Sequence, residues 1–162
     1  MKNTLNTLAV AFAIWASADA MGVNGSNRNP NPNPIGSDCM MVHSTAGWQR
    51  MRQRPAPRMN RMEISFDQGG WTVDKNGYPL VFPAIGHTQP QLEQYSQYKY
   101  DQRFPFGKML MWVDADNTNY GISGGVYGVS RGVMFRINDS DGTLGDNQGA
   151  VRVCLRYFYA ND

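Results

Sequence analysis

The sequence predicts an all-β protein folded as an antiparallel β-sandwich. Its 162 residues include 17 glycines and 9 prolines, and 12% of them are aromatic, a composition that favours strands and turns. Short apolar or alternating segments recur along the chain, separated by turns rich in glycine, aspartate and asparagine. This spacing is typical of sandwich strands. The length is sufficient for one domain with its own core.

The first twenty residues have the features of a signal peptide. They contain one positive residue, Lys2, then an apolar run from Leu8 to Ala16, and they end in Ala-Asp-Ala, the small-x-small pattern of a cleavage site. The run is too short to span a bilayer, which takes roughly 20 residues, so we expect no membrane insertion. An amphipathic first helix of a cytosolic protein is the alternative. We therefore predict an exported chain with a secreted, periplasmic or extracellular location.

Two segments then carry few strand signals. Residues 21–37 contain three consecutive Asn-Pro pairs, which keep the backbone extended, so we expect a disordered leader before a single domain over 38–162. Residues 49–62 contain five arginines and no acid. Prolines favour a solvated loop there, and a basic patch for phosphates or lipid headgroups is the alternative. The net charge of only +2 gives no reason to expect a nucleic acid partner.

The rest of the chain is predicted to form strands joined by turns. The segments either alternate apolar and polar residues or, in KMLMWV, are almost continuously apolar, as in a buried strand. The predicted strands span 62–70, 108–113, 121–130, 132–139 and 150–159. In the last one, the odd-numbered residues from Val151 to Tyr159 share one face. Segment 90–106 has no clean period and is either a short helix or a long loop carrying Tyr95, Tyr98 and Tyr100.

Cys39 and Cys154 are the two cysteines of the chain. An oxidising compartment outside the cytosol allows them to pair, and the bridge would then tie the start of the domain to its last strand. Such a long closed loop would contribute about 2–4 kcal/mol to stability. The alternative is two unpaired, buried small residues, and we favour the disulfide.

The stretch NDSDGTLGDNQG, residues 138–149, is the main candidate for a functional site. It contains three aspartates, and no lysine or arginine lies between Arg136 and Arg152 to neutralise them. A well-solvated turn is one interpretation, because Asp, Asn and Gly favour tight turns. A calcium site is the other, because calcium binds carboxylate, amide, carbonyl and water oxygens. An EF-hand is excluded, since Leu144 stands where that loop requires glycine and Ala150 where it requires glutamate.

The pattern Asn-Asp-x-x-Gly-Thr-x-Gly-Asp-Asn-x-Gly, followed by an alternating strand, resembles the calcium loop of the galactophilic calcium-dependent lectins, the family of the soluble galactose-binding lectin of Pseudomonas. The resemblance is strongest over 132–156. It continues upstream in FGKMLMWV (106–113) and GGW (69–71), while residues 1–60 have no counterpart. It implies a jelly-roll-like β-sandwich in which calcium forms part of the sugar site.

The resemblance also implies particular metal ligands. They are the side chains of Asp139, Asp146 and Asn147 and the backbone carbonyls of Thr143 and Asp74. Asp146 stands where the galactose-binding member has asparagine, and its extra negative charge should strengthen cation binding. Asn138 and Asp141 are not expected to be ligands, although Asp141 would make the local potential more negative.

The sugar contacts that the resemblance implies match less well. In the family, a histidine and a glutamine three residues later contact the saccharide, whereas Pro90 stands three residues after His87. The predicted sugar-binding residues are His87, Gln89, Gln91, Asp139 and Asn147. Trp71, Tyr78 and Phe82 are candidates for covering the apolar face of the sugar, with core packing as the alternative for each.

The implied activity is binding without turnover. Only two histidines are present, and no nucleophile elbow, catalytic triad order or zinc spacing occurs. Nor does the spacing of Asp74, Asp114, Asp116 and Asp139 favour a carboxylate pair for glycoside hydrolysis. We therefore predict a secreted calcium-dependent lectin that binds galactose-type glycans. The alternative is a structural or interaction protein in which calcium only joins two strands. A homo-oligomer is expected of a lectin, but no heptad or interface motif predicts one.

Overall fold

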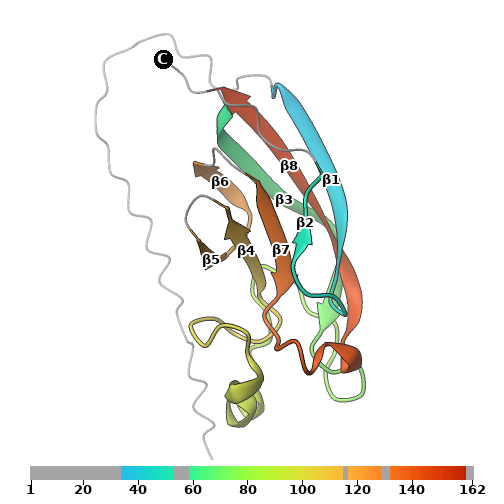
Figure 1. Ribbon diagram of the computed structural model, residues 1–162. Helices are drawn as coiled ribbons and strands as arrows, with labels where there is room; N and C mark the ends of the chain where they lie inside the picture. Colours follow the sequence, from blue (N-terminus) through green and yellow to red (C-terminus); the bar gives the residue numbers. More distant parts are fainter. Residues whose placement is uncertain (1–33, 53–58, 115–116, 129–131, 160–162) are drawn as a thin grey trace, which may run out of the picture. The chain divides into compact units, whose positions relative to one another are not determined.

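The computed structural model describes residues 34–52, 59–114, 117–128 and 132–159, and these form a two-layer antiparallel β-sandwich (Figure 1). The first sheet has the order β1-β8-β3-β6 and the second β2-β7-β4-β5. The predicted all-β sandwich is therefore confirmed. The predicted signal peptide and most of the predicted leader lie outside the described residues. Within the described part of the chain, no helix is long and apolar enough to cross a membrane.

The elements have the following bounds. The strands of the first sheet are β1 (Gly36–His43), β8 (Gln148–Tyr159), β3 (Met59–Thr72) and β6 (Gly125–Gly128). Those of the second sheet are β2 (Gln49–Arg50), β7 (Val133–Ile137), β4 (Met109–Val113) and β5 (Thr118–Gly121). Two 3₁₀ helices, η1 (Pro90–Tyr98) and η2 (Leu144–Asp146), lie at the same end of the sandwich (Figure 1).

Strand β8 shows why the alternating pattern produces a sandwich. Val151, Val153, Leu155 and Tyr157 are completely buried between the sheets, as the alternation predicts. Tyr159, which the same pattern places on this face, is instead exposed at the end of the strand. On the other face, Phe158 is buried beneath Arg61 of β3, whose guanidinium carbon lies 4.9 Å from the ring centroid. Hydrophobic burial along this one strand thus holds the two layers together.

The continuous apolar run in β4 has a different cause, because its two faces are covered by different parts of the protein. Met109, Met111 and Val113 belong to the core cluster between the sheets. Leu110 is also completely buried, but it lies outside that cluster and pairs with Arg136 of β7. The segment after η1 covers this outer face, since the Tyr100 ring centroid lies 3.8 Å from the Arg136 guanidinium carbon.

Several strand boundaries differ from the sequence prediction, and both β3 and β8 begin before the predicted residue. Strand β1 begins at Gly36, two residues inside the segment predicted as leader. The arginine-rich segment 49–62 contains β2 and the start of β3, so the loop prediction is wrong at both of its ends. Between Asn117 and Gly128 the chain forms two short strands, β5 and β6, where one was predicted over 121–130. Short strands at sheet edges bury too few side chains to leave a readable alternation.

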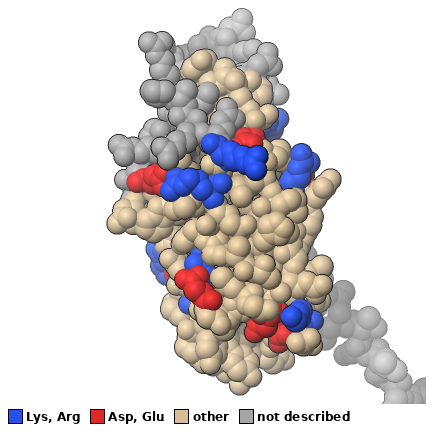
Figure 2. Space-filling view, turned by 45° about the vertical axis from the view of Figure 1, so that its right-hand side comes forward, with Lys and Arg blue, Asp and Glu red and all other residues tan. Residues whose placement is uncertain are grey.

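The charged side chains on the sheet surface are largely paired with one another. Arg152 contacts Asp67 at 2.9 Å and Arg156 contacts Glu63 at 2.8 Å. In Figure 2, basic and acidic side chains lie next to each other, and much of the visible face carries neither. Arg50, from the arginine-rich segment, likewise pairs with Asp114 at 2.6 Å. Arg54 and Arg58 of that segment lie outside the described residues, so the alternative of a basic patch stays a prediction.

The predicted disulfide between Cys39 and Cys154 is present. The two cysteines are direct cross-strand partners in the antiparallel pair of β1 and β8, which brings their Cα atoms to 4.1 Å. The bridge closes a loop with a sequence separation of 115 residues. Because β1 is an edge strand held by β8 alone, the bridge secures the beginning of the domain.

Replacing both cysteines by serine should lower the free energy of unfolding by about 2–4 kcal/mol, because the unfolded chain regains the entropy of the open loop. Urea unfolding of the oxidised chain and of the variant measures the difference. A reducing agent should lower the stability of the wild-type chain to that of the variant and leave the variant unchanged. An unchanged midpoint in the variant would contradict the stabilising role.

Candidate functional site

The candidate site is a pocket at the end of the sandwich where η1 and η2 lie (Figure 1). Three segments form it: the loop after β3, the helix η1 with the residues that follow it, and the acidic loop between β7 and β8. The pocket has a volume of about 470 Å³. Its lining residues are Val73, Asp74, Gly77, Tyr78, Leu92, Tyr95, Tyr98, Phe106, Asp139, Thr143 and Asp146. The acidic loop that the sequence singled out therefore lines this pocket, whereas the contribution of η1 was not predicted.

Asp139 is the central residue of the acidic loop. Its side chain is 2% exposed, and Oδ1 accepts hydrogen bonds from the Thr143 hydroxyl at 2.7 Å and the Ser140 amide at 3.0 Å. The other oxygen, Oδ2, is buried and has no hydrogen-bond partner. Burial raises the pKa of Asp139, and the charge of Asp146 raises it further, although Thr143, Asn147 and Ser140 favour the ionised form. Among the described residues, no lysine, arginine or histidine forms an ion pair with the Asp139 carboxylate; Arg136 contacts only the backbone carbonyl of this residue.

Asn147 presents a second unpartnered oxygen. Its side chain is 3% exposed, and Nδ2 donates a hydrogen bond to the Ser44 carbonyl at 3.0 Å, which fixes the orientation of the amide. Oδ1 then remains buried without a partner. A buried acceptor without a partner is rare and costs about 1–3 kcal/mol. Asn147 also helps to favour the ionised form of the Asp139 carboxyl, so the two side chains are neighbours in the loop.

The remaining predicted ligands lie around this pair. The Thr143 carbonyl accepts one hydrogen bond, from the Asp146 amide at 3.3 Å, and the Asp146 carbonyl accepts one from the Lys75 amide at 2.9 Å. The Asp74 carbonyl already accepts hydrogen bonds from the Tyr78 amide at 3.0 Å and from two weaker donors. Its lone pairs are therefore engaged within its own turn, and it is a poorer candidate ligand than the sequence indicated.

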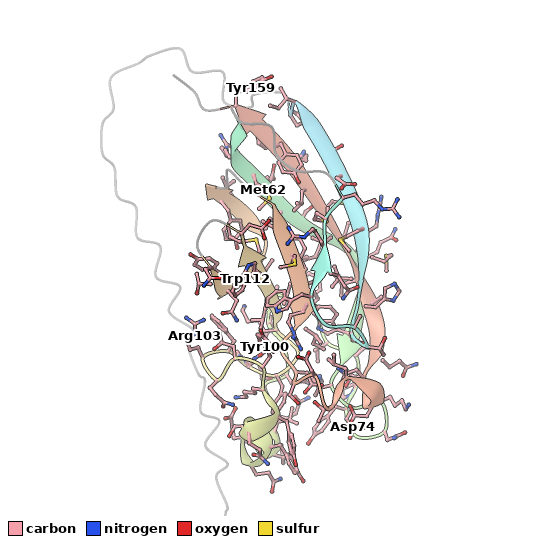
Figure 3. The ribbon with its side chains drawn as sticks, viewed as in Figure 1. Met62, Asp74, Tyr100, Arg103, Trp112 and Tyr159 are labelled. Carbon is pink, nitrogen blue, oxygen red and sulfur yellow. A yellow bond between two sulfur atoms is a disulfide. The ribbon has the colours of Figure 1, made fainter. Side chains whose placement is uncertain are left out.

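Asp74 also lines the pocket and lies at this end of the sandwich in Figure 3. Among the described residues, however, no three His, Cys, Asp or Glu side chains are grouped closely enough to hold a metal ion. A cation at Asp139 and Asp146 would thus depend on amide and carbonyl oxygens as well as carboxylates. That donor set suits calcium and does not suit zinc, which prefers nitrogen and sulfur.

Asn138 and Asp141, which were not expected to be ligands, support the loop. Asn138 is fully buried, and its amide donates to the carbonyls of Asp101, Phe104 and Pro105 at 2.9–3.0 Å. Its Oδ1 accepts from the Asp101 amide at 2.8 Å. One side chain thus attaches the segment after η1 to the acidic loop.

Asp141 forms an ion pair with Arg136 at 2.8 Å, so the expectation that no basic residue neutralises the loop is wrong. Arg136 is 1% exposed, donates a hydrogen bond to the Asp139 carbonyl at 2.6 Å, and stacks on Tyr100. It comes from β7, two residues before the loop begins. Its position on the covered outer face of the sheet could not be read from the sequence.

The structure does not bring His87 into the lining of the pocket. Its ring is 4% exposed, contacts the Tyr78 ring edge-on at 5.6 Å, and accepts a weak hydrogen bond from the Val73 amide at Nε2. Burial lowers the pKa of His87, an effect that the nearby Gln89 partly offsets. His87 is thus a neutral residue packed behind Tyr78. Gln89 and the exposed Gln91 are likewise not among the lining residues.

The three aromatic candidates have different positions. Trp71 is completely buried and donates a hydrogen bond from Nε1 to the Gly107 carbonyl at 2.6 Å, so it belongs to the core. Phe82 is half-exposed and packs against Phe66. Only Tyr78 lines the pocket. No role was predicted for Tyr95 and Tyr98, yet their spacing of three residues places them on one side of a 3₁₀ helix.

Comparison with known proteins provides little guidance. No protein-family profile matches the chain, and no curated protein matches it. One solved structure, described as "EclA N-terminal domain; PllA-like lectin", has 16% sequence identity to this chain and a TM-score of 0.47. The match covers 75% of this chain and 96% of that one.

The buried His87 should make stability depend on pH. Because its pKa is lowered in the folded state, the unfolded state binds the proton more tightly, and stability should fall as the pH decreases below about 6.5. Thermal unfolding in EDTA between pH 7 and pH 5 should show a weaker pH dependence for His87→Gln than for wild type. Substituting exposed His43 by Gln is the control and should leave the dependence as it is. Equal slopes in all three proteins would refute this role.

Arg136→Met should lower the free energy of unfolding by about 2–4 kcal/mol, because it removes charge-assisted hydrogen bonds to two buried carbonyls and the ion pair with Asp141. The matched control is Arg152→Met, which breaks the exposed pair with Asp67 and should cost less than about 1 kcal/mol. Urea unfolding measures both. Similar losses in the two variants would show that Arg136 does not support the loop.

Proposed function

We propose that the chain is an exported, calcium-dependent carbohydrate-binding protein that recognises galactose-type glycans. The observation that carries this proposal is the pair of buried, unpartnered oxygens, Asp139 Oδ2 and Asn147 Oδ1, in a loop that lines an open pocket. A folded protein gains nothing from leaving such atoms without partners, whereas a bound cation would satisfy both. The resemblance of the loop sequence to the galactophilic lectins supports the same function.

Calcium is the cation that fits the donors. Asp139, Asp146 and Asn147 would supply side-chain oxygens and Thr143 a backbone carbonyl, and water would complete the six to eight ligands that calcium takes. Asp139 would bind in its ionised form, so the metal would supply the positive charge that this buried carboxylate lacks. A bound calcium ion also offers coordination positions that two neighbouring sugar hydroxyls can occupy in place of water.

The residues of this chain would orient the sugar. The carboxylate oxygens of Asp139 and the amide oxygen of Asn147 can accept hydrogen bonds from the sugar hydroxyls. Because these acceptors have fixed positions, they would favour sugars whose hydroxyls point toward them. The Tyr78 ring lines the same pocket and can cover the apolar C–H face of the ring. Since His87 packs against Tyr78, it would act on the sugar through the position of that ring and not by contact.

One observation favours the second candidate, a protein in which calcium only stabilises the fold. The histidine expected to contact the sugar is buried, and neither it nor the two nearby glutamines line the pocket. A calcium ion would in that case connect the loops after β3 and β7 without leading to recognition. The two candidates share the metal site and differ only in sugar binding.

Calcium at a hundredfold excess over its dissociation constant should stabilise the wild-type chain by about 2.7 kcal/mol, and EDTA should reverse the effect. Asp139→Asn should abolish this stabilisation. In EDTA, however, the variant should be at least as stable as wild type, because it removes a buried charge without changing the shape of the side chain. Calorimetric titration and thermal unfolding measure both effects. Asp67→Asn, which removes an exposed carboxylate from β3, is the control and should behave as wild type.

Retention on galactose-agarose that EDTA abolishes would support the lectin. A large stabilisation by calcium without retention, and without binding to a glycan array, would leave the structural candidate. If Asp139→Asn neither weakens calcium binding nor changes the stability in calcium, both candidates fail.

A further inference from the structure

The wall of the pocket opposite the acidic loop is aromatic and comes from η1. Tyr95 and Tyr98 line the pocket together with Tyr78, while Leu92 and Phe106 close it from behind. Tyr95 and Tyr98 are 45% and 46% exposed, whereas Leu92, on the same helix, is 5% exposed. Leu92 therefore attaches η1 to the core, and the two tyrosines are not needed for packing. Large aromatic rings that remain exposed beside a pocket are typical of binding surfaces.

This wall is held rigidly against the acidic loop. The Ser140 amide donates a hydrogen bond to the Tyr98 carbonyl at 2.7 Å. Lys99, directly after η1, is buried, contacts Glu93 at 3.3 Å, and lies over the Phe106 ring. Asn138 fixes the carbonyls of residues 101, 104 and 105, as described above. These bonds attach the backbone at the end of η1 to the acidic loop, so Tyr95, Tyr98 and Asp139 line one pocket.

The pocket has room for more than one sugar residue, and its lining is acidic. Its volume of about 470 Å³ lies within the range of pockets that enclose drug-sized ligands. Asp74, Asp139 and Asp146 line it, and none of the described residues that line it is a lysine or an arginine. A ligand with a negative charge would therefore be repelled unless it was bound to the metal itself.

We propose that Tyr95 and Tyr98 form a second subsite, which stacks on the next residue of a neutral oligosaccharide whose terminal residue lies at the acidic loop. The subsite rests on the proposed function, because it extends the same pocket. The subsite favours oligosaccharides over monosaccharides, because a monosaccharide at Asp139 would make no contact with the two tyrosines. It also selects for neutral chains, because the three carboxylates disfavour sulfated or carboxylated residues.

The test compares two probes, methyl β-galactoside with one ring and lactose with two, by calorimetric titration in calcium. Lactose should bind the wild-type chain about two- to tenfold more tightly, which corresponds to one aromatic stacking contact. The double variant Tyr95→Ala/Tyr98→Ala should lose this advantage and retain its affinity for methyl galactoside and for calcium. Tyr95→Phe/Tyr98→Phe should keep most of the advantage, because the rings remain.

Two further measurements make the result specific. Tyr159→Ala removes a tyrosine that is 54% exposed at the opposite end of the sandwich (Figure 3), and it should bind both probes as wild type does. Lactose sulfated on its glucose unit should bind more weakly than lactose, and the difference should shrink as salt is added. Circular dichroism and thermal unfolding check that each variant is folded.

The outcomes separate the subsite from the proposed function. If lactose and methyl galactoside bind with equal affinity, or the alanine variant keeps the preference for lactose, the subsite is wrong and the calcium-dependent lectin stands. If the wild-type chain binds calcium but neither sugar, the subsite and the sugar part of the proposed function fail together. If calcium does not bind, the proposed function fails at the metal.

Discussion

The antiparallel pairing of β3 with β8 is the constraint on which the site depends. Its last pairs, Trp71 with Gly149 and Thr72 with Gln148, place the loop that follows β3 beside the loop that precedes β8. The register cannot shift by even one residue without turning the alternating side chains of β8 out of the core. Gly149 has a φ of 102°, and a side chain there would collide with the backbone of Gly70. Close backbone contact therefore brings Asp74 and Asp146 to one pocket, although 71 residues separate them in the sequence.

Around this pairing, the acidic loop divides its polar side chains between two tasks. The side chain of Asn138 donates hydrogen bonds to the segment after η1, and that of Asp141 forms an ion pair with Arg136. Asp139 and Asn147 each have one buried side-chain oxygen that accepts no hydrogen bond from the described residues. The residues that support the loop and the candidate ligands thus lie within one short stretch, and the neighbours Asn138 and Asp139 differ in this respect.

The sequence was most informative where one local pattern determines the structure. Alternation predicted β8, a continuous apolar run predicted β4, and the spacing of Asp, Asn and Gly predicted a loop between two strands. The cysteine pair was also predicted correctly, because only two are present. Contacts between distant segments could not be predicted. The burial of His87 depends on Val73 and Tyr78 packing over it, and the pairing of Arg136 with Asp141 depends on Tyr100 and Trp48 covering a sheet face. The position of Tyr95 and Tyr98 beside the acidic loop could not be predicted either, because it depends on the hydrogen bond from the Ser140 amide to the Tyr98 carbonyl.

The disulfide-linked strands also determine how the domain would be presented. Gly36 of β1 pairs with Tyr157 of β8, so the described domain begins and ends at the same place. Tyr159 and Asp74 lie at opposite ends of the sandwich (Figure 3), which puts that place far from the pocket. A tether, fusion partner or solid support joined directly to either end of the described domain would therefore leave the pocket facing outward. The pocket would thus be accessible both in a protein attached to a surface at this end and in one immobilised there for an assay.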